Sequence, residues 1–373
     1  MLLLAHQLAS RHEITIVSAK CEEEIAKKVN WIRIPMEYDF IRFTLRFEYL
    51  KRAILKKVLD SGLKFDVVHI TLPIMQFDNI AKKVVFTWHF CSRAAWRIWL
   101  RGGMRYRGRV WRNKFFYNVL GWIRYGLPAF SEFLRIKNVH NEEIIWVAAS
   151  EGLARDITHI WNISDNRIRV IQNAIHPRFF DASFHDNRNE LRKKIKINEK
   201  DILLATVSHG RWAIKGTFEI LAAIAKLESY IKLLIIGGSR IEHLKREAKD
   251  LDIQNRVIFC GFADPLPYLQ AADIFVFPSW YEGFGLAPVE AAAVGLPVIA
   301  SRANGIVEWL KEGETGLFCE PNRDSIASCI NLLVSNPELR RKLSEGARKA
   351  ASCYTPEVMA ARYEKLYEES IQK

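Results

Sequence analysis

Two successive series of short β-rich runs, separated by helical or loop segments, constrain the fold of this chain more than any other feature. The first series comprises "EITIVSA" (13–19), "DVVHIT" (66–71), "KVVFTWH" (83–89) and "IIWVAAS" (144–150). The second comprises "ILLATVS" (202–208), "IKLLIIGG" (231–238), "RVIFCGF" (256–262), "IFVFPS" (274–279), "PVIAS" (297–301) and "GLFCE" (316–320). Such alternation is typical of doubly wound parallel sheets, so we predict an α/β fold.

A polar, charge-rich stretch between the two series, residues 181–201, predicts a link between two domains. The length of 373 residues also fits two domains better than one. Two parallel α/β domains in tandem create a cleft, and ligands of such sheets bind at the carboxyl ends of the strands. We therefore expect the functional residues to follow strands and to face this cleft.

Positive charge is concentrated in the first half of the chain. Residues 51–150 contain 18 Lys and Arg against 6 Asp and Glu, and the segment 93–124 interleaves Arg with Trp, Tyr and Phe. Such a segment is compatible with an ordinary buried helix pair with solvated arginines, with helices lying on an anionic membrane, or with base stacking. We favour the membrane surface, and we expect no nucleic-acid partner because no nucleic-acid-binding module accompanies the segment.

Several functional classes are disfavoured by what the sequence lacks. The six cysteines are scattered, without metal-ligand spacing, so we expect reduced thiols and no structural zinc. No apolar run approaches the roughly 20 residues that span a bilayer. The opening "MLLLAHQLAS" is a poor signal peptide. We predict a cytoplasmic protein, peripheral at the inner face of the plasma membrane.

The loop after "ILLATVS" is the first candidate for ligand chemistry. It contains Gly210, Arg211 and Lys215, and a helix is expected to follow. A glycine at a strand end allows close approach of a ligand, and two cations four residues apart could hold a diphosphate from both sides. A lysine in the first turn of a helix is also common without a function. The chain contains no G-x-G-x-x-G pattern, which argues against a dehydrogenase.

The stretch "FPSWYEGFGLAPVEAAAVGLPVIAS" (277–301) is the second candidate. It predicts a buried strand, then a loop with Glu282, then a helix with Glu290 that ends at Gly295. Free amides at the start of this helix, near Gly285 and Leu286, would face an anion or sugar hydroxyls. Carboxylates suit hydroxyl-rich ligands because they accept hydrogen bonds only. The alternative is that these are two unrelated surface acids.

The segment 256–321 resembles the donor-binding half of the retaining GT-B glycosyltransferases of family 4, whose E-x7-E motif is met by Glu282 and Glu290. The resemblance covers nearly the whole chain and is most specific in residues 205–320. It implies two Rossmann-like domains facing a cleft. Residues 1–180 would bind the acceptor, residues 181–352 would bind the nucleotide sugar, and a helix within 353–373 would return to the first domain.

The resemblance also implies roles for individual residues. Glu290 would hold the ribose hydroxyls, and His89 would contact the sugar near its anomeric carbon. Phe262 would border the base. The diphosphate would lie against the loop with Gly210, Arg211 and Lys215. The transferred sugar would be held by Glu282 and by the backbone amides of Gly283, Phe284, Gly285 and Leu286.

Three positions depart from the family pattern. The chain begins within what resembles the first helix, so we expect the usual first strand and its glycine-rich loop to be missing. Asn173 and Ala174 stand in place of the usual Asn-Gly after the last strand of the first domain. Asn304 and Gly305 stand in place of the usual Gly-Gly, and Glu308 is kept.

The predicted function is therefore transfer of a sugar from a UDP- or GDP-sugar, without a metal or other cofactor, to a membrane-associated acceptor such as a lipid-linked glycan or a polysaccharide. Negative charge that builds on the leaving diphosphate would be stabilised by Arg211, Lys215 and helix amides. Two alternatives remain. One is a transferase with a soluble acceptor such as a sugar phosphate, and the other is a truncated, inactive protein that binds sugar nucleotides.

Overall fold

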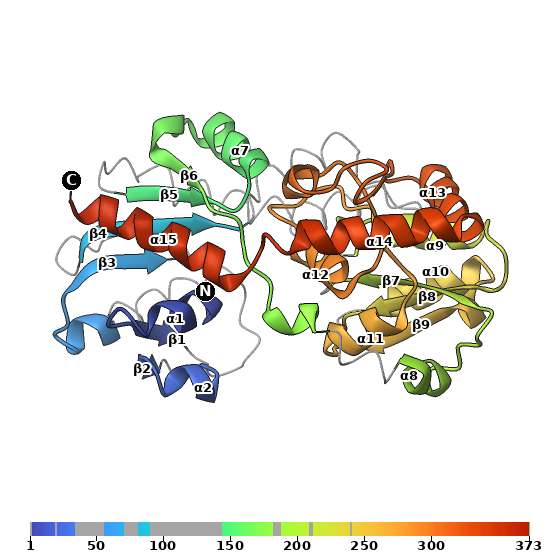
Figure 1. Ribbon diagram of the computed structural model, residues 1–373, viewed down its shortest axis with the longest axis horizontal. Coiled ribbons are helices and arrows are strands. Elements are labelled where there is room, and N and C mark those ends of the chain that lie inside the picture. Colours follow the sequence, from blue (N-terminus) through green and yellow to red (C-terminus); the bar gives the residue numbers. More distant parts are fainter. Residues whose placement is uncertain are drawn as a thin grey trace.

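The computed structural model describes residues 2–18, 21–33, 56–70, 81–89, 144–181, 188–208, 212–238 and 241–372. Two halves lie side by side along the long axis of the molecule, each with a parallel sheet (Figure 1). This confirms the predicted α/β class with two Rossmann-like domains.

The first half contains a four-stranded parallel sheet in the order β3-β4-β5-β6. Its strands are β3 (Phe65–Ile70), β4 (Ala81–Trp88), β5 (Ile144–Ala148) and β6 (Ile168–Val170). A separate parallel pair is formed by β1 (Thr15–Ser18) and β2 (Asn30–Arg33). The helical elements described in this half are α1 (Leu2–Leu8), α2 (Glu23–Ala26), α7 (Glu151–Trp161), η3 (Asp165–Arg167) and η4 (Pro177–Phe180).

The second half contains a six-stranded parallel sheet in the order β12-β11-β10-β7-β8-β9. Its strands are β7 (Ile202–Val207), β8 (Ile231–Ile236), β9 (Val257–Gly261), β10 (Ile274–Phe277), β11 (Val298–Ala300) and β12 (Gly316–Phe318). Every residue of the central strand β10 is buried, as expected for an apolar strand covered on both faces.

Helices cover both faces of the second sheet (Figure 1). They are α8 (Arg188–Lys194), α9 (Thr217–Ile224), α10 (Glu242–Asp250), η6 (Gln254–Arg256), α11 (Pro265–Ala271), α12 (Leu286–Val294), η7 (Asn304–Glu308), α13 (Arg323–Ser335) and α14 (Pro337–Ala351). Side-chain caps explain where two of them begin: Asn322 accepts from two amides of α13, and Asn336 accepts from Leu339 N at the start of α14.

The last helix, α15 (Pro356–Ile371), lies on the first half rather than the second (Figure 1). Its apolar residues, including Met359 and Leu366, pack in one cluster with Val85 of β4 and Val147 of β5. Among the described residues, the chain passes from the first half to the second near η4 and returns between α14 and α15. The two crossings are joined where Ile175 N donates a hydrogen bond to Tyr354 O at 2.9 Å.

A buried polar network fixes α15 across the first sheet. His69 on β3 contacts the Tyr367 hydroxyl through Nδ1 and the Thr87 hydroxyl through Nε2, both at 2.6 Å. Thr87 on β4 also contacts the Tyr363 hydroxyl at 3.0 Å. Burial lowers the pKa of His69 to about 3, so its imidazole is neutral at pH 7.

Candidate active site

The loop after β7 and the loop after β10 meet at the carboxyl edge of the second sheet. A Cβ atom at Gly216 would lie 2.2 Å from the carbonyl oxygen of Pro278, so only glycine permits this approach. The contact brings two predicted site residues together: Lys215 Nζ donates a hydrogen bond to Glu282 Oε1. The Glu282 side chain is only 7% exposed, and burial of a carboxylate requires such a partner.

Lys215 has a second contact in the same place. Its ammonium nitrogen lies 5.1 Å from the centroid of the Phe277 ring, at the end of β10. An aromatic face attracts a cation at this distance. The cation is therefore held at the strand end by an acid and a ring, with part of its surface reaching solvent.

Glu290 projects from the second turn of α12, beside the link between the halves. Its pKa is raised to about 7, chiefly by burial; nearby Arg178 opposes this increase, and Asp264 adds to it. Arg178 and Asp264 form a bidentate ion pair with both nitrogen-oxygen distances at 2.9 Å. Near neutral pH, Glu290 therefore changes between a hydrogen-bond donor and an acceptor-only carboxylate.

The segment after Glu282 contacts the first half directly. A Cβ atom at Gly283 would lie 2.0 Å from the carbonyl oxygen of His89, at the end of β4. Two residues on, Gly285 adopts a φ of 88° and precedes the first residue of α12, Leu286, which is 41% exposed. The free amides of this helix start are at the same edge as Glu282.

The Phe284 side chain is buried away from the loop edge. It is 2% exposed and packs edge-on against Tyr354, with ring centroids 5.3 Å apart. The ring thus points into the core between the halves. Phe262, by contrast, follows β9 and is 85% exposed at the sheet edge.

His89 lies at the end of β4, where the first half faces Gly283. The residue as a whole is exposed, but burial of its ring disfavours the charged form and lowers the pKa of His89 to about 4. A neutral imidazole can both donate and accept a hydrogen bond at pH 7. It can therefore contact a sugar hydroxyl without adding positive charge.

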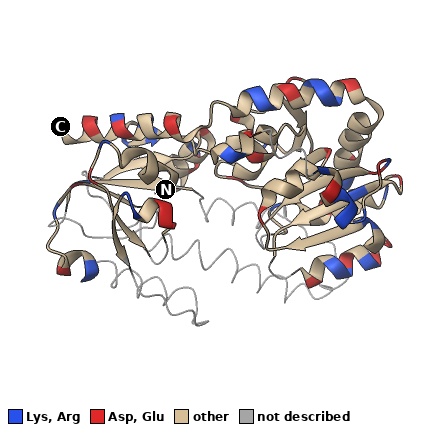
Figure 2. Ribbon diagram, turned by 60° about the horizontal axis from the view of Figure 1, so that its bottom comes forward, with Lys and Arg blue, Asp and Glu red and all other residues tan. Residues whose placement is uncertain are grey.

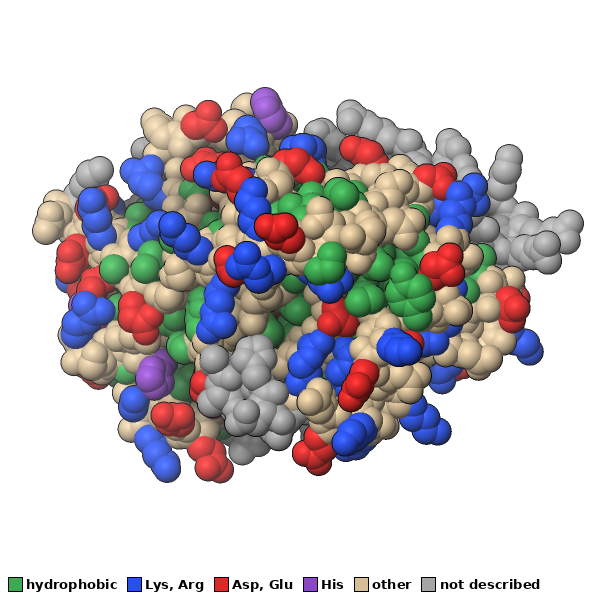
Figure 3. Space-filling view, turned by 45° about the vertical axis from the view of Figure 1, so that its right-hand side comes forward, with side chains coloured by type: hydrophobic (Ala, Val, Ile, Leu, Met, Phe, Trp, Pro, Cys, Tyr) green, Lys and Arg blue, Asp and Glu red, His purple; other side chains and the backbone are tan. Residues whose placement is uncertain are grey.

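Three predictions fall outside the described residues. Gly210, Arg211 and the basic aromatic segment 93–124 belong to parts of the chain that the structure leaves undescribed. Where the molecule is described, Lys and Arg lie among Asp and Glu along α14 and α15 (Figure 2). The face in Figure 3 likewise carries both signs intermixed. Within the described ranges no helix is long and apolar enough to cross a bilayer.

Glu308 has a contact that sequence reasoning missed. From η7 of the second half, its carboxylate accepts hydrogen bonds from Gly152 N, in the first turn of α7, and from Gln172 Nε2, both at 3.4 Å. Burial raises the pKa of Glu308. This acid joins the two halves at a helix N-terminus, a favourable place for negative charge. The signal in the sequence was the retained glutamate after Asn304-Gly305.

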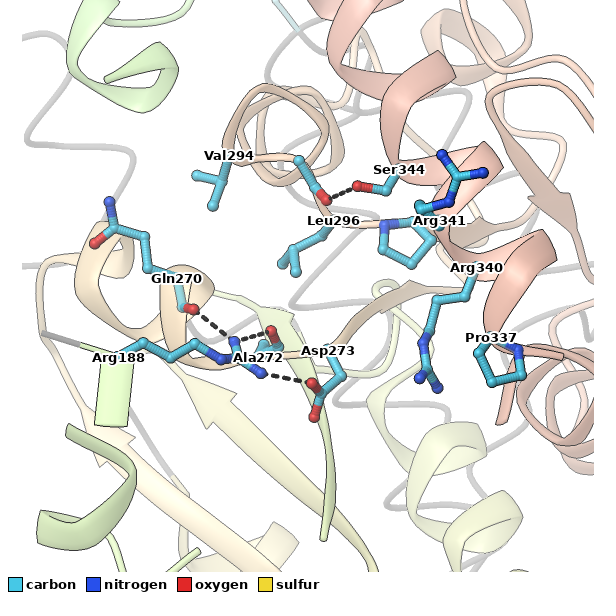
Figure 4. A pocket seen from close by; sticks show the side chains of 12 residues that line it. Arg188, Gln270, Ala272, Asp273, Val294, Leu296, Pro337, Arg340, Arg341 and Ser344 are labelled. Carbon is cyan, nitrogen blue, oxygen red and sulfur yellow. Dashed lines mark hydrogen bonds and ion pairs between the residues drawn. The ribbon is translucent and has the colours of Figure 1, made fainter. Parts of the chain in front are cut away.

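A cavity of about 420 Å³ lies at the opposite edge of the second sheet, beside the segments that lead into β10 and β11 (Figure 4). Arg188 donates to the carbonyl oxygens of Gln270 and Ala272 at 2.7 Å and to Asp273 at 2.6 Å. These groups tie α8 to the end of α11. We assign them a structural role, because the guanidinium is already engaged and the site residues lie at the other edge.

Comparisons with known proteins identify the family to which this chain belongs. The sequence profile described as "Glycosyl transferases group 1" matches residues 187–350, and the one described as "Glycosyltransferase Family 4" matches residues 1–179. An uncharacterized glycosyltransferase of Methanocaldococcus jannaschii is 30% identical over 211 residues, which are 54% of this chain and 54% of that protein.

Two further similarities are to a curated protein and to a solved structure. N,N'-diacetylbacillosaminyl-diphospho-undecaprenol alpha-1,3-N-acetylgalactosaminyltransferase of Campylobacter jejuni is 30% identical over 215 residues, 56% of each chain. The chain thus matches a little over half the length of both curated relatives. A protein of Anabaena, solved in complex with UDP-glucose, superposes with a TM-score of 0.72 at 15% identity and covers 99% of this chain and 95% of that one.

Proposed function

We propose a function from the premise that this chain belongs to the group 1, family 4 glycosyltransferases. The proposed reaction transfers a sugar from a nucleoside diphosphate to a hydroxyl group of an acceptor, with retention of the anomeric configuration. The observation that carries the proposal is the convergence of Lys215, Glu282 and the free amides of α12 at the carboxyl edge of the second sheet.

These groups have distinct roles in the proposed site. The diphosphate lies against Lys215 and the α12 amides, where cations and a helix N-terminus favour negative charge. Glu282, currently paired with Lys215, turns to the hydroxyls of the sugar once the diphosphate engages the lysine. Glu290 holds the ribose. Phe262 offers its exposed ring to the base.

The chemical step follows from this placement. The bond between the anomeric carbon and the diphosphate oxygen breaks, and a bond from the acceptor oxygen forms on the same face of the sugar. The acceptor proton passes to the leaving diphosphate. Lys215 and the α12 amides stabilise the charge that develops on that diphosphate, a role for which groups fixed in advance are most effective. Cationic side chains supply this charge, so we propose that no metal takes part.

For the acceptor we propose a lipid-linked glycan or polysaccharide at the cytoplasmic face of a membrane. The support is the basic aromatic composition of 93–124 and the similarity to a protein named for a diphospho-undecaprenol acceptor. Flotation with vesicles that contain anionic lipid tests this part. Failure to float with such vesicles would favour a soluble acceptor instead.

The donor assignment is tested with UDP-, GDP- and ADP-sugars. A ligand that binds the folded state raises the melting temperature, so at least one should do so. Glu290→Gln should weaken the affinity of the protein for that nucleotide sugar by about tenfold, the cost of roughly one charge-assisted hydrogen bond. The matched control is Glu338→Gln, on the exposed face of α14.

The same assignment predicts a pH dependence. Because the pKa of Glu290 is about 7, the carboxylate fraction increases from pH 6 to pH 8 and affinity should increase with it. Glu290→Gln should remove this dependence. Equal affinity of the parent and Glu290→Gln across this range would overturn the assignment of Glu290.

A further inference from the structure

One acidic side chain of the first half holds two loops of the second half. Asp156 lies on α7, and its Oδ2 atom accepts a hydrogen bond from the Tyr281 hydroxyl at 2.9 Å. The same oxygen accepts from Asn304 Nδ2 at 2.8 Å. Tyr281 follows β10, whereas Asn304 begins η7. Two segments of the donor-side wall therefore meet at one carboxylate that belongs to the other half.

Tyr281 is the residue immediately before Glu282, and it is held at both ends. The Tyr281 carbonyl oxygen accepts a hydrogen bond from Ser279 Oγ at 3.1 Å. The Ser279 hydroxyl also lies in hydrogen-bonding contact with Ile214 O, at 2.9 Å. The Tyr281 hydroxyl reaches Asp156, and Tyr281 is 4% exposed. A buried tyrosine held in this way fixes the backbone on which the next side chain is mounted.

The residue after Glu282 is also held from α7. Ser150, the N-cap of this helix, accepts from Leu153 N at 3.1 Å and donates to the carbonyl oxygen of Gly283. Groups of α7 and its cap therefore contact the neighbours of Glu282 on both sides, Tyr281 before it and Gly283 after it. The position of Glu282 depends on the first half, although Glu282 itself belongs to the second.

Asn304 adds a contact that a glycine could not make. The resemblance to family 4 places a Gly-Gly pair at positions 304 and 305, and glycine has no side chain that could reach Asp156. Asn304 also packs closely on α7, because a Cβ atom at Gly152 would lie 2.7 Å from its side chain. The amide thus ties η7 to the carboxylate that holds Tyr281.

We propose that Asp156 is a positioning residue. It holds Glu282 in the position that binds the donor sugar only while the two halves are in contact. Separation of the halves breaks the bonds from Tyr281 and Asn304 together, and Glu282 then loses its support from α7. Closure of the cleft and alignment of the sugar-binding carboxylate become one event. This inference rests on the proposed function, in which Glu282 contacts the sugar of the donor.

The first experiment needs no ligand. Hydrogen exchange is measured on backbone amides 281–286 in the parent, in Tyr281→Phe and Asn304→Ala, which each remove one bond, and in Asp156→Ala, which removes both. Exchange should be faster in all three variants and fastest in Asp156→Ala. The matched control is Asp165→Ala. Asp165 also belongs to the first half, but it accepts its hydrogen bond from Thr158 of that same half.

The second experiment tests whether Asp156 positions the sugar-binding residue or only stabilises the fold. Affinities are measured for UDP-, GDP- and ADP-glucose, each paired with its free nucleoside diphosphate. Asp156→Ala should lower the affinity for the nucleotide sugar that the parent binds by about tenfold. It should lower the affinity for the corresponding free nucleoside diphosphate by less than about twofold, because only the sugar requires Glu282. Asp156→Glu, which keeps the carboxylate, should restore part of the difference.

The outcomes are distinguishable. Unchanged exchange at 281–286 in Asp156→Ala would overturn the inference, and so would an equal loss of affinity for nucleotide sugar and diphosphate. A parent protein that binds none of the six compounds would overturn the proposed function instead. In that case hydrogen exchange alone decides whether Asp156 holds the segment.

Discussion

His69 of the first half and Glu219 of the second are both driven toward their neutral forms by burial, but their hydrogen bonding differs. In the first half, both ring nitrogens of His69 have hydrogen-bond partners on β4 and α15, and burial lowers its pKa to about 3. In the second half, burial raises the pKa of Glu219 on α9 to about 7, although its own backbone and Trp280 oppose the increase, and its buried Oε2 has no hydrogen-bond partner among the described residues.

The difference shows how each half is held together. The first half joins β3, β4 and α15, which are far apart in sequence, through a specific polar network around His69. The second half relies on apolar strands such as β10, which is buried throughout, and tolerates a carboxyl group that is neutral for much of the pH range. The sheet of the second half is therefore held largely by its own apolar core, whereas the sheet of the first half also depends on polar contacts with the distant helix α15.

The largest effect is expected where the halves touch. Gly283→Ala places a methyl group 2.0 Å from the carbonyl oxygen of His89, so the halves must separate. A misplacement of about 1 Å in a catalytic site can cost about 100-fold in rate, and we expect a loss of this size in sugar transfer. Each half should remain folded, which circular dichroism would verify.

Gly313→Ala is the matched control for this substitution. Gly313 lies at a φ of 72° with no atom near its would-be Cβ. Alanine there should lower the free energy of unfolding by about 1 kcal/mol through backbone strain, with transfer unchanged. Full activity of Gly283→Ala would show that the contact with His89 does not matter for the reaction.

The polar network of the first half is tested next. Tyr367→Phe leaves Nδ1 of buried His69 without its partner, and an unsatisfied buried group costs about 1–3 kcal/mol of stability. Because the folded-state pKa of His69 is about 3, stability from this group is present above pH 6.5 and is lost as pH falls toward 3. Urea unfolding at pH 7 and pH 5 measures both effects, with Tyr230→Phe at an exposed site as control.

The smallest effect concerns Glu219. Its pKa is raised to about 7, so between pH 4.5 and 7 the folded state binds a proton that the unfolded state releases, and stability falls as pH rises. Glu219→Gln should remove this loss, so that its free energy of unfolding relative to the parent increases by roughly 2 kcal/mol between pH 5 and pH 8. A gain that shrinks with rising pH would contradict the raised pKa.

The alternation of β-rich runs with helical segments predicted the α/β class, and the family resemblance predicted the two Rossmann-like domains. The β-rich runs of both series correspond to strands in the structure, because short apolar runs bounded by turns are a strong signal for parallel sheets. The strand β2, "NWIR", gave no such signal: it has four residues and alternates little. Strand order within each sheet is a matter of tertiary packing that spacing along the chain does not encode.

The site was only partly predictable for the same reason. The pattern of residues 277–301 predicted a loop with Glu282 and a helix with Glu290, as the structure shows. The ion pair of Lys215 with Glu282 was not predicted, since it depends on the contact of Gly216 with Pro278. Asp156 gave no signal at all, because its importance arises from a partner 125 residues away.

The return of α15 to the first half has a consequence for biosynthesis. Met359, Tyr363 and Leu366 complete the apolar cluster around Val85 and Val147, yet they leave the ribosome after the whole second half has been made. At a synthesis rate of about 5–20 residues per second, this apolar face of the first half stays exposed for roughly ten seconds or more before α15 can pack on it. A nascent chain of this protein therefore presents an apolar face to the cell's chaperones until α15 emerges.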